Sequence, residues 1–150
     1  MTSFDRSLPM ILNRALDDIM PDYRELFARY DLTEQQWRIL RVLWSEMRVT
    51  SADLSRRTLL PAPSLVGIID RLEKKGFVSR VRSVEDRRAV YIVPTAKGRA
   101  LEDEVTPHVA QIDARLRNTV SPEDWQHMEN TLRKIAAAAA APDLPKASNG

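Results

Sequence analysis

The chain has 150 residues, of which 43% are hydrophobic and 29% are charged, and its 23 basic and 21 acidic side chains give a formal charge of +2. This length and composition indicate one compact domain, or one domain with helical arms, which can bury a core, so disorder is not the default expectation. The absence of cysteine excludes disulfides, thiol redox sensing and cysteine-based zinc sites, and two histidines leave little for a His-rich metal site.

Two helices are predicted at the start of the chain. Apolar residues at helical spacing predict the first helix over 8–30, which Pro21 is expected to kink or to split in two. Thr33 and Gln36 have the spacing of a capping box, so a second helix should begin there and extend to about Glu46.

Two further helices and a hairpin follow. The capping sequence at 50–53 predicts a short helix that ends near Thr58, and 61–64 opens another helix, which Gly76 closes. The expected buried residues of that helix are Leu65, Ile68, Ile69 and Leu72. The period then changes, because 77–82 alternates apolar with polar residues and 89–93 is β-branched and aromatic, which predicts a β-hairpin.

The chain is expected to end with two helices. Thr95 begins a fifth helix, whose apolar stripe extends to Val120. Pro107 is expected to kink this helix. Ser121 caps a sixth helix that can extend into the alanine run at 136–141, and 142–150 is expected to be a flexible tail.

The order helix, short helix, helix and hairpin is that of a winged helix-turn-helix, so the predicted fold class is mainly α, with a small α+β lobe. Between Lys74 and Arg88 the chain has six basic and two acidic residues. This concentration of positive charge favours double-stranded DNA as a partner. The alternative is a solvated basic hairpin with no partner.

The stretch 32–101 resembles the MarR family of transcription regulators. The resemblance is carried by LTEQQWRILRVL at 32–43, PSLVGIIDRLEKKGFVSR at 63–80 and EDRRAVYIVPTAKGRAL at 85–101, where Pro94 stands in place of the usual leucine. The first two motifs most resemble regulators of aromatic-acid catabolic operons of the homoprotocatechuate type.

The resemblance implies an obligate homodimer whose helices at about 7–30 and 95–141 interlock, with a winged lobe at about 33–94. It implies a ligand-responsive regulator, in most cases a repressor, that a phenolic or aryl carboxylate effector releases from its DNA. The apolar terminal helices agree with a dimer, since so short a middle region could not cover them. Two lobes on a two-fold axis predict an inverted-repeat operator with half-sites roughly 10 base pairs apart.

The recognition helix should be about 62–75, with its outward residues entering the major groove. Ser64 can reach a base edge or a phosphate. Gly67 either lets the helix backbone approach DNA closely or only accommodates packing. Arg71 either contacts a phosphate or pairs with an acidic residue such as Asp70. Because this face is poor in Asn, Gln and Arg, we expect DNA shape to matter for recognition. The outward set is Ala62, Pro63, Ser64, Gly67 and Arg71.

For the hairpin, the resemblance implies that Arg88 enters the minor groove, with Arg87 as the alternative, and that Asp86 orients Arg88. The other reading of Asp86 is a turn-forming aspartate. The expected phosphate contacts are Lys74, Lys75, Arg80 and Arg82.

The implied effector pocket lies between the dimer helices and the winged lobe. Trp37 is the candidate stacking surface, and Arg14 and Arg38 are the candidate carboxylate partners. The alternatives are that Trp37 packs on Leu32 as a hydrophobic staple and that both arginines are solvated.

Other functions have less support. There is no nucleophile elbow, phosphate loop or HExxH motif, so an enzyme, a metal site and a cofactor are not expected. A winged-helix protein-interaction module, or an architectural DNA-binding protein without an effector, is the alternative, and the salt dependence of DNA affinity would discriminate. No apolar run reaches about 18 residues and no signal layout opens the chain, so we expect a cytoplasmic protein that binds no membrane.

Overall fold

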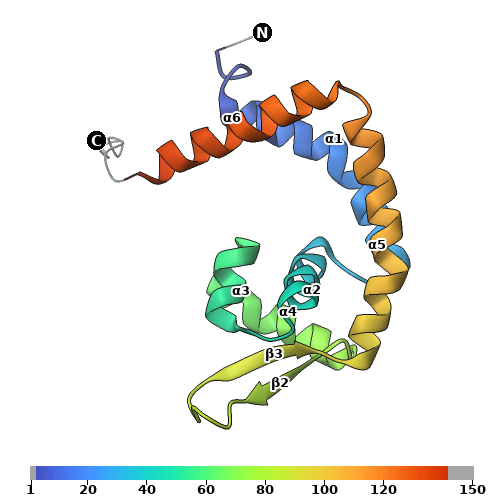
Figure 1. Ribbon diagram of the computed structural model, residues 1–150, viewed down its shortest axis with the longest axis vertical. Helices are drawn as coiled ribbons and strands as arrows, with labels where there is room; N and C mark the ends of the chain where they lie inside the picture. Colours follow the sequence, from blue (N-terminus) through green and yellow to red (C-terminus); the bar gives the residue numbers. More distant parts are fainter. Residues whose placement is uncertain (1–2, 142–150) are drawn as a thin grey trace. The chain divides into compact units, whose positions relative to one another are not determined.

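The computed structural model describes residues 3–141, which contain six helices and three strands (Figure 1). They group into two compact units, residues 1–110 and 111–150. The element order confirms the predicted winged helix-turn-helix and the mainly α fold class. The elements are α1 (Leu8–Arg29), α2 (Glu34–Glu46), β1 (Val49–Thr50), α3 (Ser51–Thr58), α4 (Ala62–Lys74), β2 (Val78–Arg82), β3 (Val90–Pro94), α5 (Ala96–Arg117) and α6 (Pro122–Ala140).

Side-chain caps begin α2 and α3, and a left-handed glycine follows the end of α4. The predicted capping box is present, because Thr33 Oγ1 accepts a hydrogen bond from Gln36 N at 3.1 Å and Gln36 Oε1 accepts one from Thr33 N at 3.2 Å. Thr50 Oγ1 accepts a hydrogen bond from Asp53 N at 3.2 Å and so caps α3. Gly76 follows α4 with φ +77°, a left-handed conformation in which glycine is favoured.

The core of the first unit lies among α2, α3, α4 and the sheet. The predicted inward face of α4 is buried, with exposed fractions of 3% or less for its four apolar residues. These side chains pack in a core that also contains buried Ile39, Leu40 and Leu43 of α2, Leu54 of α3 and Ile92 of β3. This core holds the helix-turn-helix rigidly, so the opposite face of α4 is presented to solvent as a fixed surface.

The sheet has the strand order β1-β3-β2 and is antiparallel throughout. The predicted hairpin is confirmed, with Val78 opposite Pro94 and Arg82 opposite Val90. Strand β1 was not predicted, because two residues are too few to show a period of two. It pairs with β3 through Val49 opposite Ile92.

The long helices differ from the predictions in two respects. Helix α1 runs through Pro21 without a break, so the expectation of a split was wrong. Helix α5 runs through Pro107 but ends at Arg117, so Val120 lies outside it and is 46% exposed. Ser121 caps α6 as predicted, accepting a hydrogen bond from Asp124 N at 3.1 Å.

Residues 142–150, for which a tail was predicted, lie outside the described residues. Within 3–141, no helix is both long enough and apolar enough to cross a membrane.

Candidate functional site

Helix α4 has one buried and one exposed face, as its sequence predicts. Six residues of its first turn and its last turn are exposed, while Gly67 is half-buried. Val66 is also exposed, at 60%, and was missed as an outward residue although it directly follows the inward Leu65. The exposed residues of α4 are Ala62, Pro63, Ser64, Val66, Arg71, Glu73 and Lys74.

Gly67 leaves space on this face. A Cβ atom added there would meet only the far end of the Arg71 side chain, at 3.7 Å from Nη2. No neighbouring element requires the glycine, which argues against the packing explanation. Asp70 does not pair with Arg71, because its carboxylate binds Arg80 instead.

Arg80 of β2 is bound to two carboxylates of α4. Its Nη2 lies 2.6 Å from Asp70 Oδ1, and its Nη1 is paired with Glu73. Burial alone would lower the pKa of Arg80, but the hydrogen bonds to Asp70 and Glu73 outweigh it and raise the pKa above its ordinary value. In this structure the Arg80 guanidinium joins the hairpin to the recognition helix, and its contact with phosphate stays a prediction.

Lys75 is also occupied within the chain. Its ammonium group binds Asp31 and Gln36 at the start of α2. The phosphate contact of Lys75 stays a prediction, and in this structure two of its three N–H donors are bonded within the chain.

The wing loop between β2 and β3 is shaped by two short polar side chains. Ser83 Oγ accepts hydrogen bonds from Glu85 N at 3.2 Å and Asp86 N at 3.1 Å, and Asp86 Oδ1 accepts one from Arg88 N at 3.0 Å. Asp86 thus forms the turn and accepts a hydrogen bond from the backbone of Arg88, as its turn-forming reading expects. That Asp86 orients the Arg88 guanidinium stays a prediction.

The wing presents cations that have no partner among the described residues. The guanidinium groups of Arg82, Arg87 and Arg88 are exposed and make no hydrogen bond or ion pair with any other residue between 3 and 141. The side chains of Lys74 and Arg71 near the end of α4 are also exposed and have no hydrogen-bond or ion-pair partner among the described residues. An unpartnered arginine is available to bind phosphate or the minor groove without breaking an internal bond.

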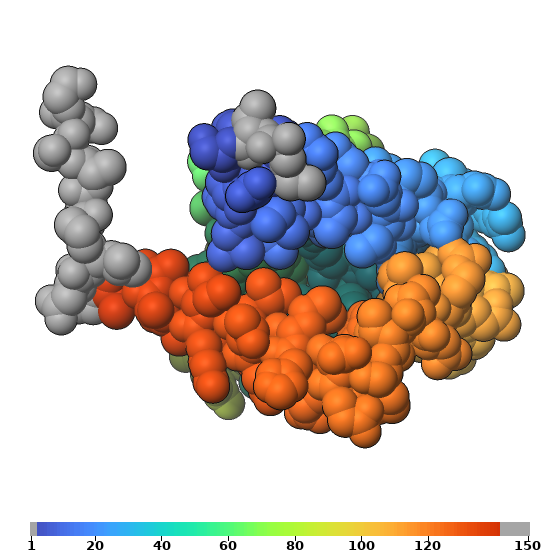
Figure 2. Space-filling view, turned by 90° about the horizontal axis from the view of Figure 1, so that it is seen from above, coloured from blue at the N-terminus to red at the C-terminus, as the bar shows by residue number. Residues whose placement is uncertain are grey.

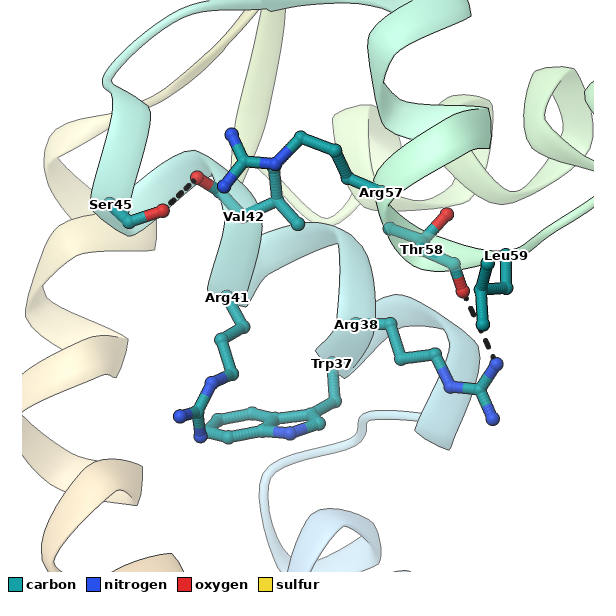
Figure 3. Close-up of a pocket in the computed structure, with 8 residues that line it drawn as sticks. All are labelled: Trp37, Arg38, Arg41, Val42, Ser45, Arg57, Thr58 and Leu59. Carbon is teal, nitrogen blue, oxygen red and sulfur yellow. Dashed lines mark hydrogen bonds between the residues drawn. The ribbon is translucent and has the colours of Figure 1, made fainter. Parts of the chain in front are cut away.

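A cavity of about 450 Å³ lies beside α2 and the end of α3 (Figure 3). The candidate effector residues Trp37 and Arg38 line it, together with Arg41 and Arg57, which the sequence analysis did not name. No residue of α1, α5 or α6 lines this cavity, so it does not lie between the dimer helices and the winged lobe, where the pocket was expected. Arg41 follows Trp37 by one helical turn, a spacing that could have identified it. Arg14 does not line the cavity and pairs with Asp5 at 2.6 Å.

The aromatic residue of this cavity is part of the core. The Trp37 ring stacks on Phe27, with centroids 4.9 Å apart, and meets Trp44 edge to face at 5.3 Å. Trp37 is therefore a packing residue whose remaining surface faces the cavity. Whether Leu32 forms a staple with it stays a prediction.

The arginines of the cavity differ in their partners. Arg38 Nη2 lies 2.5 Å from Glu34 Oε1, and its Nη1 donates a hydrogen bond to the Thr58 carbonyl oxygen at 3.3 Å. Arg57 pairs with Glu46 at 2.9 Å. Arg41 has no ion pair within the described part of the chain, and its guanidinium lies beside the Trp37 indole (Figure 3). An aromatic surface beside a free cation suits an aryl carboxylate.

No cluster of three or more potential metal-ligating acidic or histidine side chains is present among the described residues.

Comparison with known proteins assigns the family. A profile of the MarR family matches residues 32–90. The homoprotocatechuate degradative operon repressor of Escherichia coli is 32% identical over 131 residues, which cover 87% of this chain and 88% of that protein. The chain belongs to the MarR family. As a member of this family, the protein is a DNA-binding transcription regulator.

Solved structures of MarR-family proteins share the fold. NadR in complex with 4-hydroxyphenylacetate is 29% identical with a TM-score of 0.76, covering 91% of this chain and 96% of that one. A MarR variant from E. coli complexed with operator DNA is 21% identical with a TM-score of 0.80, covering 90% of this chain and 99% of that one.

Proposed function

We propose that this MarR-family protein is a repressor that binds an inverted-repeat operator as a homodimer and is released by a small aromatic carboxylate. The observation that carries the DNA-binding part is the exposed face of α4 beside the unpartnered wing arginines Arg82, Arg87 and Arg88. Together these surfaces match the two grooves of a duplex, one for a helix and one for an inserted arginine.

In this proposal α4 enters the major groove. Ala62, Pro63 and Val66 supply apolar contacts to thymine methyl groups, Ser64 reaches a base edge or a phosphate, and Gly67 allows close approach. Arg71, Lys74 and Arg82 bind phosphates, and Arg88 or Arg87 enters the minor groove. Because the α4 face offers few hydrogen-bonding side chains, much of the sequence preference comes from DNA shape.

The homodimer is supported by apolar residues that the single chain leaves uncovered. The surface of α1 is open along much of the helix (Figure 2), and no residue of α6 is buried. The dimerising parts would be the helices at about 7–30 and 95–141, as expected from the sequence. The exposed large apolar residues of α1 are Leu8, Ile11, Leu12 and Leu16, which recur at helical spacing on one stripe.

For the effector, we propose the cavity beside Trp37, with Arg41 as the carboxylate anchor. The relative NadR is solved with 4-hydroxyphenylacetate, which has the aromatic ring and carboxylate that this cavity would take. Arg38 is a second anchor only if the effector displaces Glu34, and Arg14 is left out because it lies elsewhere. A metal or cofactor plays no part in this proposal.

The proposal includes a cytoplasmic protein that is a regulator and not an enzyme, as its relatives are named. The competing function is an architectural or protein-interaction module without an effector. A specific feature against it is the free Arg41 in the cavity, because an unpaired cation beside an aromatic ring serves ligand binding better than stability.

The test is selection of bound fragments from the source genome, followed by binding isotherms on the recovered duplex at several salt concentrations. The proposal predicts an inverted repeat, tight binding relative to unrelated DNA and a steep salt dependence. Equal affinity for all duplexes would favour the architectural module, and no binding would refute the proposal.

A further inference from the structure

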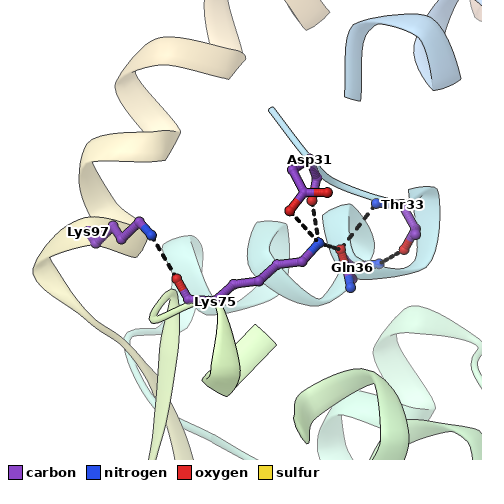
Figure 4. A network of polar contacts seen from close by, with 5 residues as sticks. All are labelled: Asp31, Thr33, Gln36, Lys75 and Lys97. Atoms are coloured by element: carbon purple, nitrogen blue, oxygen red, sulfur yellow. Dashed lines mark hydrogen bonds and ion pairs between the residues drawn. The ribbon is translucent and has the colours of Figure 1, made fainter. Parts of the chain in front are cut away.

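Lys75 lies where the C-terminal end of the recognition helix meets the linker between α1 and α2 (Figure 4). Its Nζ donates hydrogen bonds to the Asp31 carbonyl oxygen and, at 3.1 Å, to Gln36 Oε1, and it lies 3.3 Å from Asp31 Oδ2. Two of the three N–H donors of the ammonium group are thus used in hydrogen bonds, and its charge is paired with the Asp31 carboxylate. The side chain is accordingly only 26% exposed.

The acceptor on α2 is itself saturated. The Gln36 side chain is 2% exposed, and its Oε1 accepts from Thr33 N at 3.2 Å as well as from Lys75. Both lone pairs of this buried oxygen are therefore used. Lys75 therefore completes the hydrogen bonding of a buried side chain in the first turn of α2.

Helix α5 holds the same end of α4. Lys97 Nζ donates a hydrogen bond to the Lys75 carbonyl oxygen at 2.8 Å and lies 4.8 Å from the Phe77 ring centroid. Thr95 Oγ1 donates to the Gly76 carbonyl oxygen at 2.5 Å. The end of α4 is thus bonded both to the α1–α2 linker and to the start of α5.

We propose that Lys75 is a positioning residue: it sets the orientation of the recognition helix relative to α1, α2 and α5 and does not contact DNA. The inference rests on the proposed DNA-binding function. A positioning residue affects contacts that need accurate placement of α4 in the groove, whereas a phosphate-binding lysine contributes equally to all duplexes.

Adjacent Lys74 provides a matched control. It has the same charge at the same helix end, but it is exposed and has no partner among the described residues. The experiment compares Lys75→Met with Lys74→Met in the full chain, on the selected operator and on an unrelated duplex, over a range of salt concentrations. Stoichiometric titration gives the active fraction, so that misfolded protein is not counted as weak binding.

We expect Lys74→Met to weaken binding to both duplexes by the same factor. It should also reduce the slope of log affinity against log salt concentration by about one. Lys75→Met should weaken operator binding by about fivefold or more while leaving the salt slope and the affinity for unrelated DNA unchanged. If Lys75→Met behaves like Lys74→Met, or like the unmodified protein, the inference is overturned while the proposed function stands. If the unmodified protein shows no operator preference, the proposed function fails, and the inference fails with it.

Asp31→Asn gives a second variant should Lys75→Met not fold. Asparagine tolerates the left-handed backbone at this position, where φ is +54°, and the side chain is 88% exposed. Weakening the contact to Lys75 should lower operator affinity by about twofold without changing binding to unrelated DNA. A purely electrostatic role predicts the opposite, since loss of an acid would raise the affinity for both duplexes, and that result would overturn the inference.

Discussion

Arg80 Nη2 lies 2.6 Å from Asp70 Oδ1, and this ion pair joins the first strand of the wing to the recognition helix. The second guanidinium nitrogen of Arg80 binds Glu73, one turn further along the same helix. The wing and α4 are the two surfaces proposed to meet DNA. Their relative placement is therefore fixed before binding, which reduces the ordering cost of binding.

Replacing Arg80 should affect the stability of the fold more than it affects the electrostatic contribution to DNA binding. Arg80→Met leaves Asp70 and Glu73 without their shared partner, so the free energy of unfolding should fall by about 1 kcal/mol. The control is Arg82→Met two residues away, which should change stability by less than about 0.5 kcal/mol but reduce the salt slope by about one. Denaturant unfolding and salt-dependent binding measure both effects. The assignment is wrong if Arg80→Met leaves stability unchanged and lowers the salt slope as Arg82→Met does.

Removing the minor-groove arginine should weaken operator binding without affecting assembly. Arg88→Ala is expected to raise the operator dissociation constant by about tenfold or more, because a cation in a narrow groove is lost. Arg88 has no side-chain partner among the described residues, so the melting temperature and the dimer should be unaffected. Unchanged operator affinity for Arg88→Ala together with a large loss for Arg87→Ala would assign the insertion to Arg87.

Two glycines should respond to alanine in opposite directions. At Gly98 an added Cβ would overlap the Phe77 carbonyl oxygen, so Gly98→Ala should destabilise the fold by about 1–3 kcal/mol. At Gly67 the Cβ meets only the end of Arg71 at 3.7 Å, so Gly67→Ala should stabilise by about 0.5–1 kcal/mol. The second variant should nevertheless bind operator less well if α4 approaches DNA closely at this point. A stable Gly67→Ala protein with full operator affinity would show that no close approach occurs there.

The cavity arginines can be separated by single substitutions. With 4-hydroxyphenylacetate as the probe, Arg41→Met should weaken ligand binding by about tenfold or more, because a charge-assisted contact is lost. Arg14→Met is the control and should leave ligand binding unchanged, since Arg14 pairs with Asp5 away from the cavity. Calorimetric titration measures both variants. An effect of Arg14→Met equal to that of Arg41→Met would place the effector elsewhere.

Signals within one helical turn were predictable from the sequence. The Thr33–Gln36 capping box, the Ser121 cap and the buried stripe of α4 depend on residues three or four apart, and the structure has all of them. The two-residue strand β1 was missed because its pairing with β3 involves residues far apart in the chain.

The internal partners of two candidate DNA-binding residues could not be predicted for the same reason. Basic residues were assigned to phosphates from their sign and position alone, but Lys75 meets Asp31, 44 residues away, and Arg80 meets Asp70, ten residues away. A sequence shows how many cations lie on a stretch, and only the tertiary contacts show which are already paired. Arg57 was missed similarly, because the cavity forms where α2 and α3 come together.

The most direct test of the whole account is a hydroxyl-radical footprint of the protein on its selected operator. The account predicts two equivalent protected half-sites related by a dyad, with centres roughly 10 base pairs apart and with minor-groove protection that Arg88→Ala removes. A single asymmetric footprint, or protection that survives the loss of both Arg87 and Arg88, would contradict it.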